Sequence, residues 1–328
     1  MKAIVYHEYG SPDFVLELKD IDKPAVKDDE VLVRVHAASA NPYDWHFMTG
    51  LPYFMRLQAG LFKPKANVLG ADVSGQVEAV GKSVEQFQPG DEVFAAVESG
   101  GFAEYTCVSE DLLGLKPANL TFEQAAAVPL AAGTALQGLR DHGQIQPGQK
   151  VLINGASGGV GTFAVQVAKS FGAEVTGVCS TRNVDMVRSI GADHVIDYTQ
   201  EDFIESGQRY DLIFQLAGSR SPSDCRGALT PKGTLVLSSG EGGGPWFGPI
   251  GRIINALVSS LFVSQTLRTF TAVPNKEDLA ALKELIEAGK VTPVIDRTYP
   301  LNEVPDAIRY LEEGHTQGKV VITVTTEP

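Results

Sequence analysis

Alternating apolar and polar positions dominate roughly the first 120 residues of the chain. The segment 30–36, EVLVRVH, alternates as a half-buried β-strand does. Turn signals follow at 88–91 (QPGD) and at 100–101 (GG). Short strands separated by turns at this spacing predict a small β-barrel in the N-terminal part.

The pattern changes at Thr121, which forms a capping box with Gln124 ahead of an alanine-rich helical stretch. From residue 150 onward, short apolar segments typical of strands alternate with segments whose apolar residues recur with the period of a helix. The expected strands are 150–154, 174–179, 194–197, 211–216 and 234–238, and the expected helices are 159–171, 182–190 and 275–288. From 293 we expect strand, helix and a last strand at 319–325. This alternation predicts an α/β fold with a doubly wound parallel sheet.

Composition narrows the class of protein. The length of 328 residues suggests about two domains. A formal net charge of −13 argues against a nucleic-acid partner. The three widely spaced cysteines form no CxxC pair, and the start of the chain has no signal-peptide pattern. The apolar stretch 253–263 is too short for a membrane span. We therefore expect a cytoplasmic protein without a membrane span.

The segment 155–161, GASGGVG, follows a clear strand and opens a clear amphipathic helix. Small residues there let the backbone approach a pyrophosphate, whose charge the helix N-terminus stabilises. The stretch predicts a dinucleotide site that includes Ser157, Gly158, Gly159 and Val160. The alternative is an ordinary glycine-rich turn.

The end of the next strand indicates which nicotinamide cofactor binds. An NAD enzyme usually places an acidic residue there to bind the ribose 2′-hydroxyl. Here the strand runs into Ser180, Thr181 and Arg182, with no acid before Asp185. Hydroxyl donors and a guanidinium group suit a 2′-phosphate, so NADPH is favoured. Arg182 could instead be a solvated residue in the first turn of a helix.

Several motifs in order resemble those of the medium-chain dehydrogenase/reductase superfamily, nearest to its zinc-free quinone oxidoreductase (zeta-crystallin-like) branch. They are ANPYD (40–44), LGADVSG (69–75), FQPGD (87–91), the glycine loop and GADHVIDY (191–198). The resemblance covers essentially the whole chain. It implies a GroES-like barrel of residues 1–122 and 293–328 and an inserted Rossmann NADP(H)-binding domain of residues 123–292. We also expect a homodimer.

Asp72 interrupts the apolar run 68–81 and raises the question of a metal. By resemblance, zinc-dependent members carry Cys where this chain has Asn41, and Gly-His-Glu where it has Gly70, Ala71 and Asp72. Catalytic zinc needs three protein ligands, and alanine supplies none. We expect no metal, and we expect Asp72 to pair with a basic group or backbone amides and to hold its loop in shape.

Without zinc, substrate must be polarised by hydrogen bonds, which suits a quinone or an α,β-unsaturated carbonyl. The expected function is zinc-independent, NADPH-dependent reduction of such a substrate. The resemblance points to 41–53 for substrate contacts, with Tyr53 as first candidate proton donor, His46 as second and water as third. Asn41 is a candidate substrate or nicotinamide contact. Alternatively, Tyr53 is a packed loop aromatic and His46 a solvated loop residue.

Further cofactor contacts are carried over by position from the resemblance. Thr134 matches a threonine near the nicotinamide, Tyr198 lies where relatives contact the adenosine phosphate end, and Lys319 matches a basic residue near the cofactor or is a strand-edge lysine. Two strand ends add Leu216, Ala217, Gly218, Ser238 and Ser239. The segment 241–268 is expected to form a mobile loop and an apolar helix. A pocket wall or lid is the favoured role, and packing against a partner subunit or contact with a membrane surface are the alternatives.

Two other functions stay open at this point. One is a zinc-type NAD(P)-dependent alcohol dehydrogenase, which the missing ligands disfavour. The other is a non-enzymatic, crystallin-like protein that binds NADPH. Metal content and turnover of quinones or enones would discriminate among the three.

Overall fold

The computed structural model describes residues 1–218, 220–238, 246 and 264–324. The chain divides into two compact units. Unit 1 is Met1–Leu130, Pro274–Glu287 and Pro293–Pro328, and unit 2 is Ala131–Val273 and Ala288–Thr292. The domain boundaries expected at 122/123 and 292/293 stay a prediction, and the units assign residues 123–130 and 274–287 to the N-terminal side.

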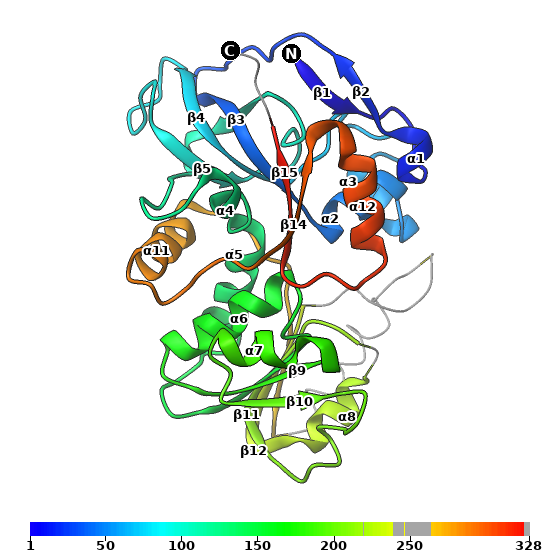
Figure 1. Ribbon diagram of the computed structural model, residues 1–328, viewed down its shortest axis with the longest axis vertical. Coiled ribbons are helices and arrows are strands. Elements are labelled where there is room, and N and C mark those ends of the chain that lie inside the picture. Colours follow the sequence, from blue (N-terminus) through cyan, green and yellow to red (C-terminus); the bar gives the residue numbers. More distant parts are fainter. Residues whose placement is uncertain (219, 239–245, 247–263, 325–328) are drawn as a thin grey trace. The chain divides into compact units, whose positions relative to one another are not determined.

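Unit 1 is built on a seven-stranded, mostly antiparallel sheet (Figure 1). The strand order is β14 (Ile295–Pro300), β15 (Lys319–Thr323), β3 (Glu30–Ala40), β4 (Asp72–Val80), β5 (Glu92–Ala96) and β7 (Leu113–Leu115), and β6 (Tyr105–Ser109) also pairs with β3. Val31, Val33 and Val35 are completely buried, as the alternation predicts for one face of a strand. The expected strand 30–36 is confirmed and extends to Ala40.

The C-terminal strand returns to this sheet. β15 lies antiparallel to β3, with Val320 opposite Ala40, which confirms the topology implied by the resemblance. A small hairpin of β1 (Lys2–Val5) and β2 (Glu17–Asp20) stands apart from the sheet. The helices of unit 1 are α1 (Pro12–Val15), α2 (Pro42–Thr49), α3 (Arg56–Ala59), α4 (Phe122–Ala126), α11 (Lys276–Glu287) and α12 (Val304–Glu312). The predicted capping box at Thr121 starts α4.

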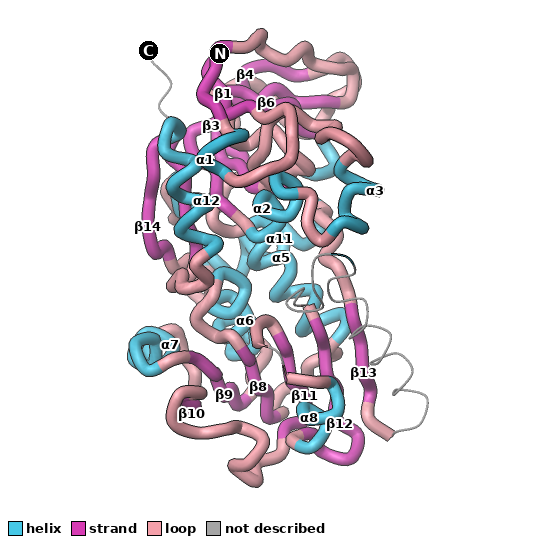
Figure 2. Tube along the Cα trace, turned by 90° about the vertical axis from the view of Figure 1, so that its right-hand side faces the viewer, coloured by secondary structure: helices cyan, strands magenta, loops and turns pink. Residues whose placement is uncertain are grey.

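Unit 2 contains a six-stranded parallel sheet, seen in magenta in Figure 2. Its order is β10 (His194–Asp197), β9 (Glu174–Cys179), β8 (Lys150–Asn154), β11 (Tyr210–Gln215), β12 (Leu229–Leu237) and β13 (Thr266–Thr269). Along the chain this order reads 3-2-1-4-5-6, which is the Rossmann arrangement. The α-helices among the described residues of this unit are α5 (Pro129–Gln137, shared with the end of unit 1), α6 (Gly159–Ser170), α7 (Val184–Ser189) and α8 (Pro222–Gly227). The predicted doubly wound sheet is confirmed.

Some predicted elements were wrong in detail. The helix expected at 182–190 is a 3-10 turn, Thr181–Asn183, followed by the shorter α7. A helix was expected within 241–268, but its last residues belong to strand β13, where Thr266 and Leu267 pair with β12. The β-branched side chain of Thr266 favours a strand. The rest of that segment, with Ser239, lies outside the described residues apart from Trp246, Ser264 and Gln265. Among the described helices, none is long and apolar enough to cross a bilayer.

Candidate functional site

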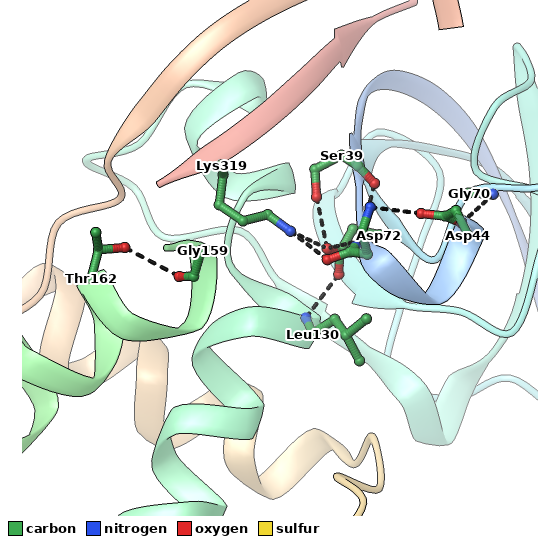
Figure 3. Close-up of polar contacts among 9 residues, drawn as sticks. Ser39, Asp44, Gly70, Asp72, Leu130, Gly159, Thr162 and Lys319 are labelled. Carbon is green, nitrogen blue, oxygen red and sulfur yellow. Dashed lines mark hydrogen bonds and ion pairs between the residues drawn. The ribbon is translucent and has the colours of Figure 1, made fainter. Parts of the chain in front are cut away.

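A buried polar network forms where three strands of unit 1 meet (Figure 3). Ser39 lies directly opposite Asp72 in the pairing of β3 with β4, and Lys319 begins the neighbouring strand β15. Ser39, Asp72 and Lys319 are exposed by 0%, 0% and 3%. Strand register therefore brings together side chains as distant in sequence as Asp72 and Lys319, which are 247 positions apart.

Every oxygen of the Asp72 carboxylate is occupied by a donor. Oδ2 accepts hydrogen bonds from Ser39 Oγ at 2.7 Å and from Asn41 Nδ2 at 2.9 Å, and it lies 3.3 Å from Lys319 Nζ. Oδ1 accepts the backbone N–H of Leu130, in the first turn of α5, at 2.8 Å. A helix N-terminus stabilises negative charge. The carboxylate is paired with both a basic group and a backbone amide, which confirms the pairing expected for Asp72.

Asn41 is held by the same network. Its Oδ1 accepts a hydrogen bond from Lys319 Nζ at 2.5 Å, and its Nδ2 also donates to the carbonyl of Ser39 at 3.1 Å. The carboxamide of Asn41 is therefore oriented by an ammonium on one side and by a carboxylate on the other. Its predicted contact with substrate or nicotinamide stays a prediction, as does the predicted cofactor contact of Lys319.

These residues do not fit a catalytic zinc site. A catalytic zinc ion would need three protein ligands around it and a fourth coordination position open to water or substrate. Ala71 has no donor atom, and the ammonium of Lys319 already lies against Asp72 and Asn41. Throughout the described ranges, no three His, Cys, Asp or Glu side chains are grouped as a metal site would require.

A second buried carboxylate, Asp44, lies at the start of α2. Its Oδ2 accepts the backbone N–H of Asn41 at 2.8 Å, and its Oδ1 accepts that of Gly70 at 3.0 Å. Burial raises the pKa of Asp44 to about 7, although the two N–H donors act in the opposite direction. Asp44 thus ties the segment that contains Asn41 to the loop before β4.

The two candidate proton donors lie on the segment after Asn41. His46, in α2, donates through Nδ1 to the carbonyl of Leu51 at 2.7 Å, so its Nε2 is a hydrogen-bond acceptor when the ring is neutral. Tyr53 is 37% exposed, and the guanidinium of Arg56 lies 4.9 Å from its ring centre. The structure places neither side chain in the Asp72 network, and their catalytic roles stay predictions.

The glycine loop of unit 2 forms a tight, closely packed turn. Gly155 has φ +90°, and a Cβ on Gly161 would lie 2.0 Å from the carbonyl oxygen of Gly155. Gly158 caps the N-terminus of α6, and Thr162 closes the first turn by donating from Oγ1 to the carbonyl of Gly159 at 3.1 Å. The loop and helix N-terminus together suit a pyrophosphate.

Asn183 connects the loop to the end of β9. Its Nδ2 donates to Ser157 Oγ at 3.0 Å and to Ser180 Oγ at 3.2 Å. Its Oδ1 is buried and has no hydrogen-bond partner. Buried polar atoms are nearly always satisfied, so this oxygen indicates a donor that a bound ligand would bring. The exposed Arg182 directly precedes it.

Thr181 contacts the last residue of β10, Asp197, and Tyr198 directly follows it in sequence. The hydroxyl of Thr181 donates to Asp197 Oδ2 at 2.6 Å, and this hydrogen bond is the largest of several that lower the pKa of Asp197. The proton that we predicted Thr181 would offer to a cofactor is therefore directed at Asp197. The ring of Tyr198 is 64% exposed.

The order of the sheet reverses between β8 and β11, which is where ligands bind in doubly wound sheets. At this point Asn154 Nδ2 donates to Gln215 Oε1 at 3.0 Å and to the carbonyl of Ala217 at 3.1 Å. These bonds fix the turn that carries three of the predicted cofactor residues, Leu216, Ala217 and Gly218. Ser238 follows β12 and Thr134 lies in α5; their cofactor contacts stay predictions.

Sequence reasoning missed Ser39, Asn154, Asn183 and Gln215. Asn154 and Gln215 end adjacent parallel strands, and a polar residue at such an end is a signal that could have identified them. Ser39 carries no such signal, because only the register with β4 places it opposite Asp72. Asn183 lies in the run of residues that follows β9, but only the 3-10 turn Thr181–Asn183 brings its side chain to Ser157 and Ser180.

Comparison with known proteins agrees with this geometry. Residues 27–118 match the alcohol dehydrogenase GroES-like domain, and residues 190–322 match the zinc-binding dehydrogenase family. The chain is 36% identical to the chloroplastic NADPH-dependent alkenal/one oxidoreductase of Arabidopsis thaliana, over 98% of this chain and 79% of that protein.

Solved structures are similar over the full length. The quinone oxidoreductase from Coxiella burnetii is 31% identical with a TM-score of 0.86, covering 99% of each chain. The Escherichia coli quinone oxidoreductase complexed with NADPH is 25% identical with a TM-score of 0.83, covering 98% of this chain and 100% of that one. The chain therefore belongs to the medium-chain dehydrogenase/reductase superfamily, in its quinone oxidoreductase branch.

Proposed function

We propose that this protein is a zinc-independent, NADPH-dependent oxidoreductase that reduces quinones and α,β-unsaturated carbonyl compounds. The observation that carries the proposal is the buried pair of Lys319 and Asp72, because the carboxylate that lies in the stretch resembling the zinc motif is already paired with an ammonium group. Relatives named as alkenal/one and quinone oxidoreductases support the substrate class.

The residues of unit 2 fit a nicotinamide cofactor. The glycine loop and the N-terminus of α6 would hold the pyrophosphate, and Asn183 Oδ1 would accept a hydrogen bond from the bound nucleotide. Ser180 and Arg182 would bind the 2′-phosphate, because a guanidinium group pairs with phosphate in a fixed, two-pronged geometry. When bound, NADPH supplies a hydride.

On the substrate side, the chain must hold a carbonyl oxygen and supply a proton. Hydrogen-bond donors suffice for a conjugated carbonyl, which needs no metal once its oxygen is polarised. Tyr53 is the first candidate for the proton. His46 is the second, because its Nδ1 proton is already given to Leu51 and only the doubly protonated ring could donate from Nε2. Water is the third.

The test is steady-state turnover of a benzoquinone and a 2-alkenal with NADPH or NADH, with and without a zinc chelator. We expect turnover that the chelator does not change and a kcat/KM higher with NADPH. R182Q should lower the NADPH-over-NADH ratio about tenfold or more, since a charged hydrogen bond contributes about 1.5–3 kcal/mol. R188Q is the matched control, because Arg188 lies on the adjacent α7 and pairs with Asp185.

Equal or better rates with NADH would overturn the assignment of NADPH. Loss of activity with the chelator, or restoration by added zinc, would favour a metal-dependent alcohol dehydrogenase. Tight NADPH binding without turnover of any quinone or enone would favour a non-enzymatic role.

The cell compartment and oligomeric state belong to the same proposal. All three cysteines, Cys107, Cys179 and Cys225, are free, as in a reducing compartment, and we propose the cytoplasm. We also propose a homodimer. Among the described strands β13 ends the parallel sheet, and an unpaired sheet edge readily pairs with another chain. Light scattering during gel filtration tests the dimer, and a monomer at micromolar concentration would contradict it.

A further inference from the structure

The loop of residues 51–65 exposes large apolar side chains. Leu57, Leu61 and Phe62 are exposed by 76%, 58% and 90%. Scattered apolar side chains are normal on a surface, but three within six positions of one loop form a local patch. These side chains are exposed although the backbone that carries them is hydrogen-bonded to the rest of unit 1.

The backbone of this loop is fixed from within unit 1. The hydroxyl of Tyr9 donates to the carbonyl of Gly60 at 2.5 Å, and the N–H of Lys65 donates to the carbonyl of Ala59 at 2.8 Å. The guanidinium of Arg56 lies 4.3 Å from the ring centre of Tyr9, and Pro64 is buried. These contacts anchor the base of the loop and leave the apolar side chains on its outer side.

The charge of this stretch of sequence is opposite to that of the whole protein. The protein carries a net charge of −13, yet between Asp44 and Asp72 there is no acidic residue. The same stretch contains Arg56, Lys63 and Lys65. Lys63 and Lys65 are exposed and directly follow Phe62. Apolar side chains next to lysines suit a partner that has an apolar interior and anionic groups on its surface.

We propose that the 51–65 loop docks the protein onto the surface of an anionic lipid bilayer. Leu57, Leu61 and Phe62 enter the boundary between headgroups and acyl chains, and Lys63 and Lys65 pair with lipid phosphates and carboxylates. A second copy of the chain fits less well, because a two-fold contact through this loop would set the lysines against their own copies.

Docking also has a consequence for the supply of substrate. This consequence, unlike the docking itself, rests on the proposed function. Quinones and long-chain alkenals dissolve in lipid, and the candidate proton donor Tyr53 lies in the same loop. Attachment would hold this segment at the interface where such substrates are concentrated. The test below measures attachment without turnover, so its failure and failure of the proposed function are distinguishable.

The experiment is co-sedimentation of the full chain with vesicles of phosphatidylcholine alone and of phosphatidylcholine with 30% phosphatidylserine. We expect binding to the anionic vesicles that weakens with added salt. L61S/F62S should lower the partition coefficient about tenfold or more through lost apolar contact, and K63Q/K65Q should lower it about tenfold through lost charge. F14S is the control, because Phe14 is 83% exposed but lies next to Asp13, and it should bind like the wild type.

All variants should keep the wild-type melting temperature, since the substituted side chains are exposed. The proposal is overturned by any of three results. The first is absence of binding to anionic vesicles. The second is binding that F14S weakens as much as L61S/F62S does. The third is unchanged vesicle binding of L61S/F62S together with a changed oligomeric state or a changed KM for a water-soluble quinone. A changed oligomeric state would make the loop a protein interface, and a changed KM would make it part of the substrate pocket.

Discussion

At the scale of single residues, Asp72 accepts hydrogen bonds from β3 and from the start of α5, and it pairs with Lys319 of β15. Removing one partner of a buried ion pair leaves the other charge without compensation, which costs about 3–5 kcal/mol. We therefore expect D72N to lower the free energy of unfolding by about 3–5 kcal/mol in urea denaturation.

The matched control lies on the same strand. Glu78 of β4 pairs with Lys23, and both side chains are 40% exposed. Water screens such a pair, so E78Q should cost less than about 1 kcal/mol. Equal losses in D72N and E78Q would show that burial of the Lys319–Asp72 pair does not determine its contribution.

Asp44 gives a prediction about pH. Its pKa is about 7 in the folded protein because it is buried, whereas an unfolded aspartate titrates near about 3.9. Between these values the folded state binds more protons, so the free energy of unfolding falls as pH rises. The contribution of Asp44 is fully present below about pH 4 and is lost through about pH 7, with a slope of at most about 1.4 kcal/mol per pH unit.

D44N removes this titration. The destabilisation caused by D44N, measured by urea denaturation at pH 5, 6, 7 and 8, should therefore be largest at pH 5 and shrink toward pH 8. A difference between wild type and D44N that does not vary with pH would mean that Asp44 is ionised across the whole range.

At the scale of elements, the glycine loop and α6 are packed too closely to accept a side chain. A Cβ on Gly161 would meet the backbone of Gly155 and Ala156 at 2.0 Å and 2.8 Å. G161A should cost about 1–3 kcal/mol of stability through this overpacking and weaken NADPH binding. Thermal unfolding and fluorescence titration with NADPH measure the two effects.

Gly133 of α5 supplies the comparison for stability. A Cβ there would meet no atom within 4 Å, so G133A should stabilise the helix by about 0.5–1 kcal/mol. If G161A melted at the same temperature as G133A, the close approach at Gly161 would not constrain the loop.

Local patterns predicted the elements of unit 2 well, and the site of unit 1 less well. Strand 150–154 and the helix after Gly158 follow from periodicity and a glycine signal within the segment itself. The contact of Lys319 with Asp72 depends on strand register across 247 positions, which no local pattern encodes. The turn at Thr181–Asn183 was missed because polar residues after a strand suit a helix start as well as a turn.

At the scale of the whole molecule, the reactivity of the three cysteines shows whether either unit opens in the native protein. Cys107 lies half-buried in unit 1, and Cys179 and Cys225 are buried in unit 2. Burial raises the pKa of Cys107 and raises that of Cys179 to about 11, so few thiolates exist at neutral pH. We expect iodoacetamide at pH 8 to modify Cys107 slowly in the native protein and the other two only after unfolding in urea.

Mass spectrometry of the intact protein and its peptides counts and places the labels. Modification of Cys179 or Cys225 in the native protein would show that unit 2 opens without global unfolding. Retention of quinone turnover after native labelling would agree with chemistry that uses no thiol.

The pairing of Lys319 with Asp72 also limits how this protein can evolve. Neither residue can be replaced alone without leaving a buried charge, so the two positions must change together or through a compensating third substitution. A zinc site at this place would require new ligands at Asn41 and Ala71 and also removal of an ammonium that repels a cation. The ion pair is therefore an epistatic barrier to the gain of a metal site here by single mutations.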